Sequence, residues 1–142
     1  MLNRMLTFTL AAISSLFSIA AAQAPAPLAA GQEWSIQGEG LDSVRVVIGH
    51  LETVDGLSDV VHISVSGIPP EYAPGGVIGH LPYLTSALPA FLDTQTGTGE
   101  VPPEFENGLA YWRDAGGGAF DISLEELITV LLPASLPSDP SK

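Results

Sequence analysis

The sequence contains no cysteine among its 142 residues. This absence excludes a disulfide framework and a lipid-modified N-terminal cysteine. It also excludes a cysteine nucleophile paired with a histidine. A chain of this length can still bury roughly two-thirds of its surface, so a single hydrophobic core can stabilise the fold without covalent cross-links.

Basic residues are scarce: four lysines and arginines stand against sixteen acidic residues, and the formal net charge is −12. A field of this sign repels phosphate backbones and anionic lipid headgroups. We therefore predict no binding to nucleic acid. The acidity is typical of an exported protein that stays soluble through self-repulsion, and the alternative is that it attracts a cation or a basic partner.

Motifs for nucleophilic and phosphate chemistry are missing. The chain has no Gly-x-Ser-x-Gly elbow, and no lysine follows the glycines at 116–118, so these do not form a phosphate-binding loop. Some pair of carboxylates is always available among sixteen acids, so their number does not indicate glycosidase chemistry. We predict no catalytic residue, no metal ligand and no cofactor.

The N-terminus predicts a secretory signal. Arg4 precedes an uncharged apolar run that ends in small residues at Ala22. This layout is typical of a signal peptide, and we predict cleavage after Ala22 with export to the periplasm or the extracellular space. The alternative is an uncleaved N-terminal membrane anchor, because residues 5–22 approach the minimum length of a membrane-spanning helix. Cleavage would leave one domain and no membrane segment.

A long β-hairpin is predicted over about residues 44–67. Apolar and polar residues alternate through both halves, which indicates two half-buried strands, and Asp55-Gly56 between them favours a two-residue turn. Closing the pair at this turn predicts the cross-strand pairs Ile48–Ile63, Val46–Val65 and His50–Val61. This register leaves Glu52 opposite Asp59, a like-charge pair that a longer loop would relieve. A short strand around Trp34 is expected to precede the hairpin.

Three helices are predicted, at about residues 82–92, 103–115 and 123–132. Apolar residues recur at helical spacing in each, and glycines after residue 115 stop the second. The third begins with a capping box formed by Ser123 and Glu126, and Pro133 is expected to end it. Its predicted apolar stripe consists of Leu124, Leu127, Ile128 and Leu131.

The order of these elements predicts a two-layer α+β domain over residues 32–132, in which three helices cover one face of a mainly antiparallel sheet. Residues 23–31 are rich in alanine and proline and are expected to be a flexible lead-in, and residues 133–142 a disordered tail. The segment from Asp93 to Pro103 is expected to be a mobile loop, and Ala119 to Ile122 a short strand. Trp34, Trp112 and Phe120 are expected to lie in the core rather than to form a ligand platform.

Several short segments resemble a group of small exported bacterial proteins of uncharacterised function. The segments are Val61-His62-Ile63-Ser64-Val65, Ile78-Gly79-His80-Leu81-Pro82, Tyr111-Trp112-Arg113 and Gly118-Ala119-Phe120, followed by the capping box. The resemblance spans about residues 33–132. It implies a similar fold and carries over no activity and no catalytic residue.

The three histidines, His50, His62 and His80, raise the question of a metal site, because imidazole is a common zinc ligand. Their spacing matches no compact ligand motif, and the predicted register places His50 and His62 on opposite faces of the sheet. His62 and His80 would converge only if the chain folded back past the hairpin.

Arg113 and Trp112 are the other candidate binding residues. Within the predicted domain only Arg45 and Arg113 are cationic, so Arg113 would either form a structural ion pair or bind a carboxylate ligand. We predict a non-catalytic module that binds an unknown protein or small molecule, with Arg113, Trp112, His62 and His80 as candidate ligand-binding residues. The alternative is a small hydrolase or metal-dependent enzyme that uses His62 or His80 with a carboxylate.

Overall fold

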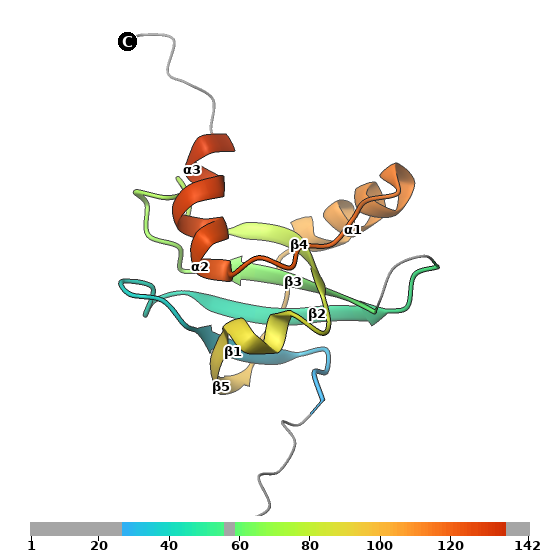
Figure 1. The fold of residues 1–142 in the computed structure, drawn as a ribbon, viewed down its shortest axis with the longest axis horizontal. Helices are drawn as coiled ribbons and strands as arrows, with labels where there is room; N and C mark the ends of the chain where they lie inside the picture. Colours follow the sequence, from blue (N-terminus) through green and yellow to red (C-terminus); the bar gives the residue numbers. More distant parts are fainter. Residues whose placement is uncertain (1–26, 56–58, 136–142) are drawn as a thin grey trace, which may run out of the picture.

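The computed structural model describes residues 27–55 and 59–135 and contains one five-stranded antiparallel sheet (Figure 1). The strands are β1 (Gln32–Ile36), β2 (Arg45–Glu52), β3 (Val60–Ser66), β4 (Ile78–Leu84) and β5 (Leu92–Thr98). They lie in the order β4-β3-β2-β1-β5, so β4 and β5 form the two edges. The protein is thus α+β, as predicted. No helix within the described residues is long and apolar enough to cross a membrane.

One face of the sheet carries the larger hydrophobic core. Alternate residues of β2 and β3 point to this face because side chains alternate along a strand. They pack against the C-terminal helical segment and against the 3₁₀ helix η1 (Leu88–Phe91). The fully buried members of this core include Val46, Ile48, Val61, Ile63, Leu124 and Ile128.

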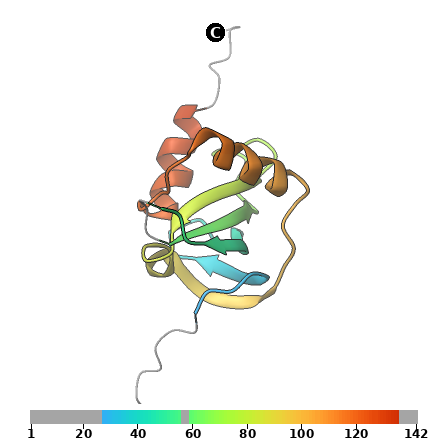
Figure 2. The same ribbon diagram turned by 90° about the vertical axis from the view of Figure 1, so that its right-hand side faces the viewer.

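The opposite face is also covered, by helix α1 (Glu104–Ala115). Its buried residues Phe105, Leu109 and Trp112 form a second cluster with Val60. Figures 1 and 2 show α1 on one side of the sheet, with η1 and the C-terminal helix on the other. The prediction of two layers is therefore wrong. The polar alternate positions of β3 face a helix rather than solvent, and His62 and Ser64 are buried there.

The predicted helix at 82–92 is replaced by the end of β4, a turn and η1. Tyr83 and Leu84 lie opposite Val61 and Val60 of β3. This strand pairing overrides the helical spacing of Leu84, Leu88 and Phe91 on which the prediction rested. Pro82 lies in the strand itself, which is possible because β4 is an edge strand.

The predicted loop after Asp93 is also wrong, because β5 runs through Thr98 and pairs with β1. Leu92 is buried and the remaining residues of the strand are exposed, so no alternation of apolar residues marks it. Backbone hydrogen bonding to β1 holds the strand in place. The short strand predicted at Ala119 to Ile122 is reduced to a single bridge between Phe120 and Tyr83.

The C-terminal helical segment runs without a break through α2 (Leu124–Glu126), the π-helical turn η2 (Leu127–Leu131) and α3 (Leu132–Ser135). The capping prediction is confirmed in one half: the Glu126 backbone N–H donates to Ser123 Oγ at 3.1 Å. Pro133 does not end the helix. The wide turn before it relieves the clash between a proline ring and the preceding turn.

Two apolar residues predicted to be buried are not. Leu131, expected in the apolar stripe of the last helix, is 45% exposed, and Phe120, expected in the core, is 37% exposed. The predicted signal segment, the Gly56 position of the predicted turn and the tail beyond residue 135 lie outside the described residues.

Candidate functional site

The site begins with a register shift in the pairing of β2 and β3. Val46 lies opposite Val65 and Ile48 opposite Ile63, but His50 lies opposite His62 rather than Val61. The shift falls at Gly49, where a Cβ atom would lie 2.4 Å from the buried ring of Phe105. Glycine at this position lets α1 approach the bulged strand. The bulge also brings His50 to the same face as His62, which corrects the predicted placement on opposite faces.

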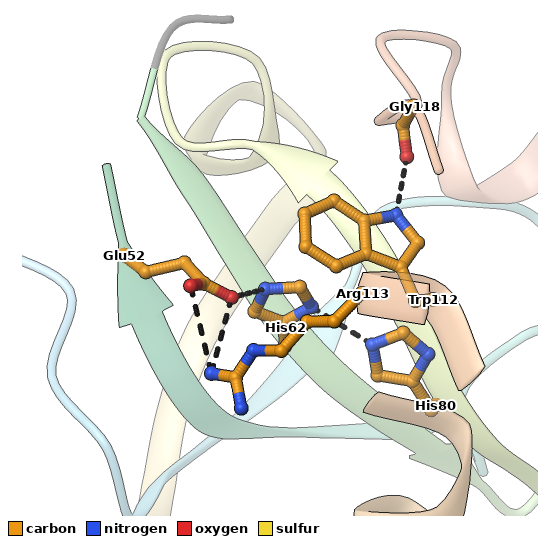
Figure 3. Close-up of polar contacts among 6 residues, drawn as sticks. All are labelled: Glu52, His62, His80, Trp112, Arg113 and Gly118. Atoms are coloured by element: carbon orange, nitrogen blue, oxygen red, sulfur yellow. Dashed lines mark hydrogen bonds and ion pairs between the residues drawn. The ribbon is translucent and has the colours of Figure 1, made fainter. Parts of the chain in front are cut away.

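His62 forms the centre of a hydrogen-bonded chain under α1 (Figure 3). Its Nδ1 lies 2.8 Å from Nε2 of His80, and its Nε2 lies 2.7 Å from Oε1 of Glu52. The side chain of His62 is fully buried, whereas that of Glu52 is 22% exposed. The chain Glu52–His62–His80 therefore links the edge of the α1-covered core to its interior.

The ionisation of these groups sets the direction of the hydrogen bonds. Burial lowers the pKa of His62 and outweighs the hydrogen bond to Glu52, which raises it. Burial, and then the neighbouring His62, lower the pKa of His80 to about 4. Burial alone would raise the pKa of Glu52, but the hydrogen bond from His62 and the charge of Arg113 lower it overall. At neutral pH an anionic Glu52 accepts from His62 Nε2–H, and His80 Nε2–H donates to the unprotonated His62 Nδ1.

Trp112 of helix α1 packs against the hydrogen-bonded chain Glu52–His62–His80. Its ring meets the His62 ring edge to face, with centroids 4.6 Å apart. The indole N–H donates to the backbone oxygen of Gly118 at 2.8 Å, which anchors the segment after the helix. Helix α1 ends at Gly116, which adopts the left-handed conformation with φ of 61°, and Gly117 then packs against the indole so closely that a Cβ would lie 2.3 Å from it.

Arg113 contacts the carboxylate of Glu52 from the solvent-exposed side. One guanidinium nitrogen is 3.4 Å from Oε1 and 3.5 Å from Oε2 of Glu52, and the arginine side chain is 48% exposed. These contacts are long for hydrogen bonds between charged groups. Arg113 is thus held loosely and keeps donor capacity for another acceptor.

An open depression of about 640 Å³ lies beside this ion pair. Its walls contain both charges of the pair, the side chain of Trp112 and the backbone of the glycine segment. The lining residues are Glu52, Thr53, Val54, Asp55, Trp112, Arg113, Gly116, Gly117 and Gly118. The depression can offer a guanidinium, two carboxylates and exposed peptide groups to a polar ligand. We call it the Arg113 depression.

All four residues singled out from the sequence, His62, His80, Trp112 and Arg113, belong to this one assembly. Sequence reasoning missed Glu52, which the predicted register set against Asp59. In the structure Glu52 lies opposite Val60, because the bulge moves the end of β2 by one residue. The glycine between Ile48 and His50 was the one available signal, since glycine within a strand often marks a bulge.

The arrangement of Glu52, His62 and His80 can be compared with that of a metal site and with that of an oriented imidazole. Among residues 27–55 and 59–135, no group of three or more histidine, aspartate and glutamate side chains is arranged to hold a metal ion. Both ring nitrogens of His62 are engaged by Glu52 and His80. The carboxylate therefore orients His62, and His62 in turn orients His80, which is the pattern of a carboxylate–histidine pair extended by one imidazole.

Comparisons of this chain with known protein families, with curated proteins and with solved structures gave no match.

Proposed function

We propose that this protein is an exported, non-catalytic binding domain whose Arg113 depression takes a polar ligand through a carboxylate group. The export part of the proposal rests on the N-terminal sequence pattern, and the resemblance to small exported bacterial proteins stays part of it. The binding part rests on one observation: a half-exposed guanidinium, poorly paired with Glu52, borders an open depression.

The guanidinium of Arg113 and the two carboxylates at the depression suit a ligand that carries a carboxylate together with hydroxyl or amino groups. An exposed ion pair as long as the one between Arg113 and Glu52 contributes little stability, so its loss costs little. A ligand carboxylate can instead accept two parallel hydrogen bonds from the arginine fork. The released Glu52 stays bonded to His62 and, with Asp55, accepts from hydroxyl or amino groups of the same ligand.

The buried chain behind Glu52 supports this role. A binding site needs its polar groups held in place before the ligand arrives, because ordering them on binding costs affinity. Glu52 is fixed by a 2.7 Å bond to a fully buried histidine, whose other nitrogen is fixed by His80. The chain thus pre-organises the carboxylate at the wall of the depression.

The test is a titration followed by ¹H–¹⁵N correlation spectra. The probes are acetate, succinate and glycylglycine, with glycinamide as a probe that lacks a carboxylate. We expect the indole N–H signal of Trp112 to shift with the three carboxylates and not with glycinamide, while that of Trp34, outside the depression, stays in place. A larger shift with glycylglycine than with succinate would favour a peptide end over a simple organic acid.

Arginine variants complete the test. Arg113→Gln is expected to abolish the shift. Arg45→Gln is the matched control, because Arg45 donates to the backbone oxygens of Asp42 and Val44 away from the depression. Equal responses of the two variants, or no shift with any carboxylate, would refute the proposed function.

A second candidate function, a small hydrolase, is favoured by the convergence of Glu52, His62 and His80. In this reading the chain would make an imidazole a general base, an effect typically worth about 10²- to 10⁴-fold in rate. The assay is hydrolysis of 4-nitrophenyl acetate by the wild type and by His62→Gln. A loss of about a hundredfold would favour the enzyme, and equal rates would count against it. Thermal shifts with zinc and calcium test the metal-dependent version, since an ion bound only by the folded form raises the melting temperature.

A further inference from the structure

A second cavity, of about 450 Å³, lies apart from the Arg113 depression and shares no lining residue with it. Leu51 lines the second cavity and its neighbour Glu52 lines the first. Adjacent residues of a strand point to opposite faces, so the second cavity opens on the face covered by η1. We call it the Trp34 cavity. Its size falls within the range of small-molecule sites in proteins.

The walls of the Trp34 cavity are mainly apolar. They consist of Leu28, Trp34, Leu51 and Leu92 with two prolines, and the polar members are Thr85 and Asp93. The tryptophan and the three leucines pack against the larger core, either as buried members or as partly buried neighbours. The cavity is therefore a gap in a packed surface, bordered by β1, β2 and the start of β5 and closed by η1, Thr85 and the segment before β1.

Two polar features define what would fit the cavity. Asp93 is exposed and is the one charged residue among the lining residues. The hydroxyl of Thr85 is buried and has no hydrogen-bond partner within the described residues. An unsatisfied buried hydroxyl destabilises the free protein, so a ligand that reaches it after rotation of the threonine side chain gains binding free energy.

We propose that the Trp34 cavity binds a small apolar amine, an aromatic or branched aliphatic body with one positively charged end. The apolar body is buried against Trp34 and the leucines, which is favourable in proportion to the area removed from water. The ammonium group pairs with Asp93 at the rim and can donate toward Thr85. The net charge of −12 favours a cation over an anion at the same site.

The experiment compares three probes of similar shape, phenethylamine, phenethyl alcohol and phenylacetate, by ¹H–¹⁵N correlation spectra of the full chain. The indole N–H of Trp34 reports this cavity and that of Trp112 reports the Arg113 depression, so one spectrum separates the two sites. We expect phenethylamine to shift the Trp34 signal at the lowest concentration and phenylacetate at the highest. The Trp112 signal should not move with the amine.

Three variants test the assignment. Asp93→Asn is expected to weaken amine binding about threefold to fivefold without affecting the alcohol, and Asp42→Asn, an exposed acid outside the cavity, should leave both unchanged. Thr85→Val should weaken both the amine and the alcohol. Leu51→Phe should fill the cavity and abolish binding. Because strands accommodate aromatic residues well, we expect β2 to tolerate this substitution.

Several results would overturn the proposal. One is the absence of any Trp34 response to phenethylamine at millimolar concentration. Another is a response of equal size to the amine and the carboxylate, which would leave only an unspecific apolar surface. A third is unchanged binding in Asp93→Asn and Thr85→Val, which decides the matter even if Leu51→Phe fails to fold.

Discussion

Acidification is expected to destabilise this fold through His80. Burial lowers the pKa of His80 to about 4, whereas the ordinary value, which applies to the unfolded chain, is 6.5. Between about pH 6.5 and about pH 4, His80 therefore binds a proton in the unfolded chain and does not bind one in the folded chain. Stability is present above this window and is lost within it.

The size of the effect follows from the two pKa values. A proton that binds at 6.5 in one state and at about 4 in the other corresponds to about 3 kcal/mol when the whole window is crossed. Between pH 7 and pH 4.5 we expect a loss of roughly 2 kcal/mol from this residue. His62 and Glu52, which belong to the same hydrogen-bonded chain as His80, also destabilise the fold on acidification, because the pKa of each is lowered in the folded state.

The variant His80→Gln isolates this contribution. A glutamine amide can still donate to His62 Nδ1, but it does not titrate. Urea unfolding of the wild type and the variant at pH 7 and pH 4.5 gives the free energy of unfolding in each case. We expect the wild type to lose about 2 kcal/mol more than the variant, since titratable groups that do not interact with His80 contribute equally to both proteins.

A direct measurement accompanies the unfolding experiment. The imidazole proton signals of His80 should titrate near pH 4 in the folded protein. A midpoint near 6.5, or parallel loss of stability in the wild type and in His80→Gln, would show that the imidazole is solvated and would refute the buried hydrogen-bonded chain.

Two further predictions concern packing and helix capping. Gly49→Ala should destabilise the protein by about 2 kcal/mol or more because its Cβ would overlap the ring of Phe105. The control Gly118→Ala should have a small effect, because no atom lies within 4 Å of the added Cβ. Chemical denaturation measures both variants, and equal losses of stability would contradict the close approach of α1. Ser123→Ala should lower the stability by about 1 kcal/mol because it removes the acceptor for the Glu126 N–H. Ser123→Asp restores an acceptor, so its thermal unfolding midpoint should be close to that of the wild type. An unchanged midpoint in Ser123→Ala would mean that the cap is dispensable.

Local chemistry alone was sufficient for several elements of this protein. The alternation around Ile63 determined a strand, the spacing of Phe105, Leu109 and Trp112 determined helix α1, and Ser123 determined the start of the last helix. These signals are legible because neighbours along the chain share a periodicity or a hydrogen bond. The identity of the four candidate residues could be read in the same way, as rare histidines and a rare arginine, although no role follows from rarity.

Long-range pairing decided the rest. Leu92–Thr98 has no alternation of its own and becomes β5 only because β1 offers it backbone partners. The burial of His62 depends on α1 covering the second face of the sheet, and its bond to Glu52 depends on a one-residue bulge at Gly49. A shift of one residue moves every later side chain to the other face. The sequence therefore determined which groups are present, and only the tertiary structure decided which of them meet.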